Sequence, residues 1–151
     1  MAQALFANQR EANLASTIAL VEEVLGELGY PADAARSGDD RRSWRITKGS
    51  ATAQITLLDR AQFTHIRVSA TVMSLDAAID RTALFTHLLE LNAGLAGAAF
   101  ATDQDRVLLL AERSTLDLDR SEVRDLILHV TTTADDHDDV LVARFGGTLG
   151  G

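Results

Sequence analysis

The sequence predicts an α+β fold in which helices pack on an antiparallel sheet. Apolar residues recur at helical spacing in three separate segments. Between residues 42 and 72, three runs alternate apolar with polar residues, and short turns connect them. The predicted order is helix, three-stranded antiparallel meander, helix, β-hairpin, helix. A chain of 151 residues that is 46% hydrophobic and 24% charged fits one folded domain.

The first predicted helix begins near Asn13, and residues 1–12 are expected to be a variable N-terminus. Its apolar residues fall at alternating steps of four and three: Leu14, Ile18, Val21, Leu25 and Leu28. Gly29 and Pro31 end the helix, because glycine suits a C-terminal cap and proline cannot continue it. Residues 32–41 are predicted to be a polar loop. We expect this helix to cover one face of the sheet.

The three strands of the meander are predicted at residues 42–48, 51–57 and 66–72. Trp44 and Ile46 share one face of the first strand, and the same alternation continues through the other two. Turns are expected at residues 48–50 and 59–62. Clean alternation predicts a sheet with one face buried and the other in contact with water.

The central helix is predicted over residues 82–95, with Asp80 or Thr82 as its N-cap. Four leucines form one stripe along it: Leu84, Leu88, Leu91 and Leu95. A hairpin over residues 98–112 follows the helix.

The last helix is predicted to begin at Asp119, which forms a capping box with Glu122, and its apolar pattern extends to Leu141. The β-branched run at residues 131–133 is expected to bend or fray it. Residues 146–151, GGTLGG, are predicted to be a flexible tail, so the single domain spans residues 13–145.

This order of elements resembles the type III secretion chaperone-like fold, which includes the secretion chaperones and the YbjN-type domains. The segments that carry the resemblance are residues 88–92 (LLELN), Phe100-Ala101, residues 107–110 (VLLL) and residues 116–118 (LDL). It covers roughly residues 13–144. The resemblance implies a small, acidic, bacterial protein that is homodimeric and non-enzymatic, and that holds an apolar segment of a partner protein in a chaperone-like or regulatory role.

The hairpin strand at residues 107–111 is apolar on both faces, unlike the three strands before it. Both faces are therefore expected to be covered, one of them by a helix of the same chain. We predict that the other contacts a second subunit or a partner, and that the interface includes Leu84, Leu88, Leu91, Leu95, Val107, Leu109 and Ala111. The alternative is that a second helix of the same chain covers it.

Two further residues carry specific hypotheses. Trp44 is the only tryptophan, and packing in the core is its default role. If its strand lies at a sheet edge, the ring is instead expected to anchor an incoming peptide. Asn92 falls where the central helix ends, and it is expected to bond the local backbone.

Charge and composition exclude several classes of protein. The formal net charge of −8 argues against binding to nucleic acid or to an anionic membrane surface. The chain has no cysteine, so it forms no disulfide and has no thiolate chemistry. No secretory signal and no apolar run of membrane-spanning length is present, which favours the cytoplasm.

No catalytic, metal or cofactor site is predicted. Residues 135–139, DDHDD, lack the spacing of a calcium loop, and neighbouring helix residues point in different directions. A solvated acidic helix face is the favoured interpretation. The four histidines are far apart in the sequence, and no nucleophile motif is present.

The alternative function is a small-molecule-binding or enzymatic α+β domain. Its ligand site is expected on the open face of the sheet. Four basic side chains there are available to an anionic ligand: Arg42, Arg45, His65 and Arg67.

Overall fold

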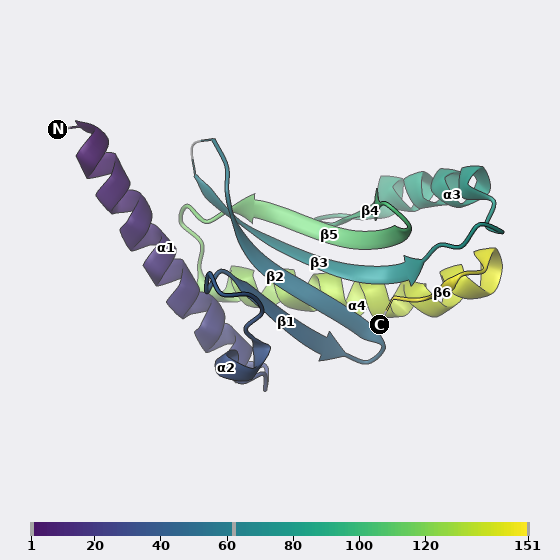
Figure 1. The fold of residues 1–151 in the computed structure, drawn as a ribbon, viewed down its shortest axis with the longest axis horizontal. Helices are drawn as coiled ribbons and strands as arrows, with labels where there is room; N and C mark the ends of the chain where they lie inside the picture. Colours follow the sequence, from purple (N-terminus) through teal and green to yellow (C-terminus); the bar gives the residue numbers. More distant parts are fainter. Residues whose placement is uncertain (1, 62, 151) are drawn as a thin grey trace.

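The computed structural model describes residues 2–61 and 63–150, with side chains described from residue 8 onward. It confirms the predicted α+β class, with all long strands antiparallel. The elements are α1 (Ala2–Glu27), α2 (Ala32–Ala35), β1 (Ser43–Lys48), β2 (Ala51–Asp59), β3 (Thr64–Ser74), α3 (Arg81–Gly94), β4 (Ala99–Asp103), β5 (Arg106–Ser114), α4 (Arg120–Phe145) and β6 (Thr148–Leu149) (Figure 1). Residues 1, 62 and 151, at the ends of the predicted N-terminal segment, turn and tail, lie outside the described residues.

The strands form one sheet in the order β1-β2-β3-β5-β4, with β6 paired to β3. The meander of β1, β2 and β3 pairs as the sequence predicts, and β5 then adds to the free side of β3. Alternate residues of β2 and β3 are buried, which matches the predicted alternation. The sheet therefore has one buried and one open face.

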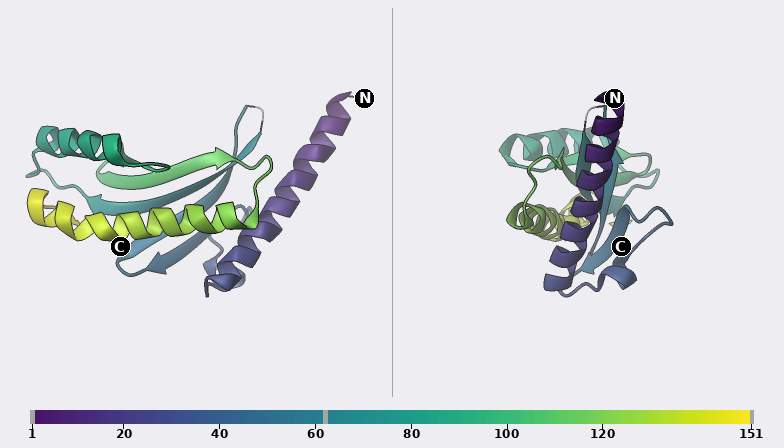
Figure 2. Two further views of the ribbon diagram at one scale, coloured as in Figure 1. Left: turned by 180° about the vertical axis from the view of Figure 1, so that it is seen from behind. Right: turned by 90° about the vertical axis from the view of Figure 1, so that its left-hand side faces the viewer.

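Helix α4, rather than the predicted first helix, covers the buried face. It runs in front of the strands in the left view of Figure 2, and its side chains Val123, Ile127 and Val130 are fully or almost fully buried. Helix α1 instead crosses one end of the sheet (Figure 1). Arg120 at the start of α4 pairs with Glu23 and Glu27, which joins the two helices. The long amphipathic pattern of the last helix matches this larger role.

Three boundaries differ from the sequence prediction. Helix α1 begins at Ala2 rather than near residue 13. Residues 2–12 contain four alanines and two glutamines, which form helices readily without an amphipathic pattern. A short helix, α2, lies within the predicted polar loop. Part of the predicted flexible tail is strand β6.

The predicted helix caps are confirmed. Asp80 accepts a hydrogen bond from the backbone nitrogen of Ala83 at 3.0 Å. Asp119 and Glu122 form both halves of the capping box. The helix does not fray at residues 131–133, because α4 continues through them to Phe145. The buried Thr131 hydroxyl donates to the carbonyl of Ile127 at 2.8 Å, so its polar group is satisfied inside the helix.

Candidate partner-binding surface

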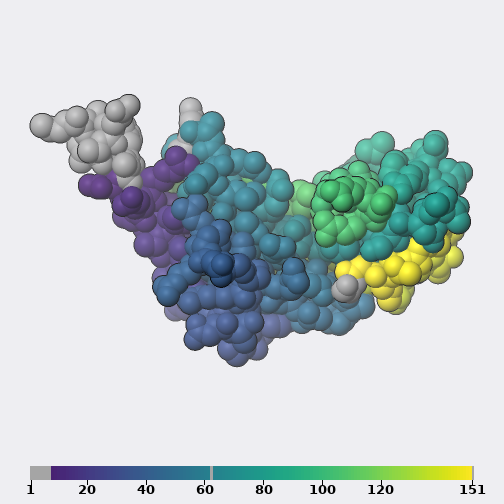
Figure 3. Space-filling model, viewed as in Figure 1, coloured from purple at the N-terminus to yellow at the C-terminus, as the bar shows by residue number. Residues whose placement is uncertain are grey.

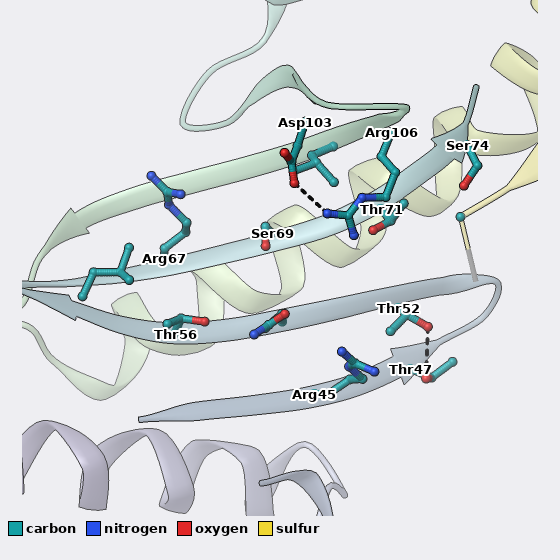
Figure 4. Close-up of a pocket in the computed structure, with 14 residues that line it drawn as sticks. Arg45, Thr47, Thr52, Thr56, Arg67, Ser69, Thr71, Ser74, Asp103 and Arg106 are labelled. Atoms are coloured by element: carbon teal, nitrogen blue, oxygen red, sulfur yellow. Dashed lines mark hydrogen bonds and ion pairs between the residues drawn. The ribbon is translucent and has the colours of Figure 1, made fainter. Parts of the chain in front are cut away.

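The face of the sheet opposite α4, called the open face here, is divided by strand into a polar and an apolar part. No helix of the described chain crosses it between β2 and β5 (Figure 1). On β1, β2 and β3 its side chains are mainly hydroxyls, amides and arginines (Figure 4). Thr47, Thr52 and Thr71 form one cross-strand row, and Arg45, Gln54 and Ser69 form the next. These rows line a concave space of about 600 Å³.

The apolar part lies on β5 and β4. Leu108 and Leu110 of β5 are half-buried on the open face, and their cross-strand partners are Ala101 and Ala99 of β4. We call these four residues the apolar strip. Figure 3 shows the hollow between the green β4–β5 turn and the blue strands β1 and β2. A half-buried apolar strip beside a polar trough suits an amphipathic partner, because each part has a matching surface.

Most residues of the predicted interface belong to the core of this chain. Five are buried: Leu84, Leu88, Val107, Leu109 and Ala111. Leu91 and Leu95 are half-buried. Since a buried side chain has no surface to offer a second subunit, the open-face residues Leu108 and Leu110 replace Val107, Leu109 and Ala111 as interface candidates. The sequence did not reveal this, because β5 is apolar at both odd and even positions.

Trp44 is also a core residue. Its side chain is 0% exposed, and its indole nitrogen lies 3.4 Å from Glu22 Oε1 of α1. The ring therefore has no surface for an incoming peptide, and the default core role is the one the structure supports. It links β1 to the C-terminal half of α1.

Asn92 caps the outer edge of β4. Its side-chain nitrogen donates to the carbonyl oxygen of Phe100 at 3.1 Å, and its oxygen accepts from the Phe100 backbone nitrogen at 2.7 Å. One amide thus bonds the donor and the acceptor that an added strand would use. The prediction that Asn92 bonds backbone is confirmed, but the backbone is that of the next strand. The bonds place the last turn of α3, with Leu91 and Leu95, beside this edge.

The opposite edge, β1, is capped as well. The backbone nitrogen of Ser37 donates to the carbonyl of Ser43 at 2.9 Å, and the hydroxyl of Tyr30 donates to the carbonyl of Thr47 at 3.1 Å. These two groups come from the segment between α1 and β1. Both lateral edges of the sheet are therefore partly occupied by the chain itself.

Most basic side chains of the predicted anion site already have acidic partners. Arg42 donates to Asp59 at 2.9 Å, and Arg67 donates to Glu112 at 2.7 Å. His65 Nδ1 lies 3.1 Å from Glu112. Arg45 has no ion pair with another residue within 2–61 and 63–150. A site that is largely neutralised has little free positive charge for an anion.

Glu112 is the centre of this ionic cluster, and its side chain is 17% exposed. Arg60 donates to its two carboxylate oxygens at 2.7 and 2.8 Å. These bonds are the largest cause of a Glu112 pKa lowered to about 2; burial opposes them and Arg67 adds to them. The cluster joins the β2–β3 turn to β5.

Replacing Glu112 with glutamine is expected to lower the free energy of unfolding by about 1.5 kcal/mol at pH 7. The folded pKa of about 2 lies below the ordinary 4.5, so the carboxylate stabilises the fold fully above pH 4.5. That contribution is lost as the pH falls toward 2. Urea unfolding of both proteins between pH 7 and pH 3 measures the difference. A difference that does not shrink toward pH 3 would contradict this role for the charge.

The acidic run at residues 135–139 is not simply a solvated face. Asp138 is 3% exposed and accepts from the hydroxyl of Ser50 at 2.6 Å. Asp135 accepts from both the backbone nitrogen and the hydroxyl of Ser50, at 3.1 and 3.0 Å. The two carboxylates thus hold the β1–β2 turn against α4. Sequence reasoning missed this because the bonded residues are more than eighty positions apart.

Other chemical sites were sought in the described residues. Within 2–61 and 63–150, no three histidine, aspartate or glutamate side chains are placed to hold a metal ion together. His129 and His137 contact backbone carbonyls of Ala96 and Thr133, both at 2.8 Å. None of the described helices has both the length and the hydropathy needed to cross a membrane.

The described chain thus combines an antiparallel sheet that a helix covers on one face with a half-buried apolar strip on the other. Residues 15–149 match the model of TY-Chap1, described as T3SS (YopN, CesT) and YbjN peptide-binding chaperone 1. The chain belongs to this family, which confirms the resemblance seen in the sequence. No curated protein matches the chain.

Solved structures agree on the fold. The ExsC–ExsE complex includes a chain with a TM-score of 0.67 and 18% identity; the match covers 85% of this chain and 95% of that one. A chain of the ExoT–SpcS complex from Pseudomonas aeruginosa matches with a TM-score of 0.55 and 16% identity, over 80% of this chain and 95% of that one. A chain of the HopA1–SchA chaperone–effector complex matches with a TM-score of 0.53 and 15% identity, over 83% of this chain and 97% of that one. At these identities the likeness establishes the shared fold.

Proposed function

We propose that this protein is a non-enzymatic, cytoplasmic homodimer that holds an apolar segment of a partner protein. Its family is one of peptide-binding chaperones. Three of its structural relatives are parts of two-protein complexes, one of them described as a chaperone–effector complex. These comparisons support a protein partner for this chain in a chaperone-like or regulatory role.

The apolar strip is the observation that carries the proposal. Leu108 and Leu110 lie on a sheet face that no helix of the described chain covers. Leucine side chains in such a position gain free energy when a further surface removes them from water, at about 25 cal/mol per Å². Leu89 of α3 is a separate exposed leucine, 69% exposed.

Capped edges indicate how the segment binds. An added strand needs consecutive free backbone groups, and Asn92, Ser37 and Tyr30 occupy such groups on β4 and β1. Side-chain contacts on the open face are therefore favoured over strand addition at these edges. In the homodimer the apolar strip lies between the two subunits, and the partner segment lies in the hollow beside it, over the threonine rows and Leu58.

The dimer is tested by light scattering on a size-exclusion column. The expected mass is twice the 16.2 kDa of one chain. A Leu110→Asp variant is expected to elute with the mass of a single chain, since a charge in the interface is costly to bury. Leu116→Asp is the matched control, because Leu116 is an exposed leucine outside the strip. A single-chain mass for the natural sequence would contradict the dimer.

The alternative is a small-molecule site in the polar part of the open face. The concave space of about 600 Å³ favours it, as does the guanidinium of Arg45, which forms no ion pair within the part of the chain that the structure describes. The ion pairs of Arg42 and Arg67 count against an anionic ligand. Protein binding is therefore the function that the site supports best.

A further inference from the structure

The segment after α4 fills a gap in the sheet. β3 has eleven residues, and β2 pairs with it only as far as Thr71. Beyond that point β6 takes the place beside β3, with Met73 opposite Leu149 and Ser74 opposite Thr148. The backbone nitrogen of Gly150 donates to the carbonyl of Val72 at 3.3 Å. We call the stretch of β3 at residues 72–74 the notch, and residues 146–150 its occupant.

Two glycines let the occupant approach closely. A Cβ atom on Gly147, whose φ is +81°, would lie 2.4 Å from the carbonyl oxygen of Ser74. A Cβ on Gly150 would lie 2.5 Å from the carbonyl oxygen of Thr71. Both distances are impossible for real side chains, so the notch accepts glycine only at these two positions. The sequence rule for an occupant is therefore Gly-x-x-Gly.

Few interactions hold the occupant in place. The ladder has two residue pairs, and the hydrogen bond from Gly150 is long. The Leu149 side chain is 42% exposed, and Thr148 is exposed as well, so little apolar surface is buried. A segment with few buried contacts opens at low free energy. Gly146 and Gly147, both with positive φ, connect the occupant to α4.

The notch differs from the two lateral edges. Those edges are capped by side chains and turns that belong to the packed body of the domain. At the notch the cover is a strand-like segment, and its removal would free the backbone groups of residues 72–74 beside the polar hollow, which Gly150 helps to line.

We propose that the notch is a strand-binding site for an extended partner segment of the form Gly-x-x-Gly, and that residues 146–150 are its internal, displaceable occupant. The proposal adds a second contact to the partner binding proposed above and rests on it for the nature of the partner. The partner segment would place its backbone on β3 while the hollow receives the residues that follow. Because the partner segment must displace residues 146–150, its apparent affinity depends on the fraction of molecules in which the notch is free.

The test uses a chain that ends at Phe145 and a capped peptide with the sequence of residues 146–150, GGTLG. The peptide is titrated into the shortened and the full chain, and backbone amide shifts are followed by NMR. In the shortened chain we expect shifts centred on residues 72–74, with a dissociation constant in the millimolar range or weaker. In the full chain the apparent affinity is expected to be at least about tenfold lower.

Two controls separate the outcomes. A peptide with valine in place of the glycines at positions 147 and 150, GVTLV, is expected to leave the shifts unchanged. A full-length Gly147→Val chain, whose occupant cannot dock, is expected to bind GGTLG as the shortened chain does. Equal affinity for the full and shortened chains, or no shifts at residues 72–74, would overturn the proposal. So would unfolding of both the shortened and the Gly147→Val chains, because a displaceable occupant must leave a folded domain behind.

Failure here is distinguishable from failure of the proposed function. The peptide titration does not involve the apolar strip or the dimer, which are tested through Leu110. A protein that is dimeric through the strip yet ignores the peptide would keep its proposed function and lose only the notch.

Discussion

Replacing Leu109 with aspartate is expected to unfold the protein or to lower its free energy of unfolding by at least about 4 kcal/mol. The Leu109 side chain is 0% exposed between the sheet and its helices. The substitution removes the buried leucine and places a carboxylate where no partner is available. Domains of this size are stable by about 5–15 kcal/mol, so much of the total is lost.

Leu110→Asp is the matched control, one position along the same strand. Leu110 is on the open face and half-buried, so we expect the free energy of unfolding of the monomer to fall by about 1 kcal/mol or less. Urea unfolding followed by tryptophan fluorescence measures both, because the only tryptophan, Trp44, is fully buried and reports on the core. Equal losses at the two positions would contradict the assignment of the strand's faces. Stability should be compared at a concentration where the control and parent have the same oligomeric state.

Replacing Asn92 with alanine is expected to lower the free energy of unfolding by about 3 kcal/mol. The change removes both partners of Phe100, whose amide and carbonyl bond the Asn92 side chain at 2.7 and 3.1 Å. Each partly buried backbone group left unsatisfied costs about 1–3 kcal/mol. Hydrogen exchange of the Phe100 amide is a second readout, and its protection is expected to fall at least about tenfold.

Thr86→Ala provides the control for Asn92. Thr86 lies on the same helix, and its hydroxyl donates to the carbonyl of Thr82 at 2.8 Å in an exposed position. Because water can replace that hydrogen bond, we expect the free energy of unfolding to change by no more than about 0.5 kcal/mol. If Asn92→Ala also falls within that range and Phe100 keeps its protection, the edge cap is not a significant source of stability.

The elements that the sequence predicted best are those whose signal is local. Alternation in β2 and β3 sets their buried faces, and the capping box at Asp119 sets the start of α4. The two-residue period of a strand and the three-residue spacing of a capping box can both be seen in the sequence without knowing which residues they contact in the fold. The family resemblance rests on the order of these same elements, and the match over residues 15–149 confirms it.

The features that the sequence did not predict depend on distant partners. The face of β5 that meets the core is decided by pairing with β3 and by α4, because leucines stand at Leu108, Leu109 and Leu110 alike. The segment that contains β6, residues 146–150, has a glycine-rich sequence typical of a flexible tail, but Gly147 and Gly150 are needed for contact with β3. Asp138 looks like a surface acid until Ser50 is placed beside it. In each case tertiary contact overrides the local pattern.

The caps on the two lateral edges also limit how copies of this protein can assemble. A sheet with two free edges can join a copy on each side, and such a head-to-tail arrangement continues into a filament unless rotation closes it. Asn92 on β4 and the Ser37 and Tyr30 bonds on β1 interrupt both directions of growth. In the proposed homodimer, association through the apolar strip would instead present the same patch from both subunits. Such a contact would be complete once two copies have met, so the stoichiometry would be finite by geometry.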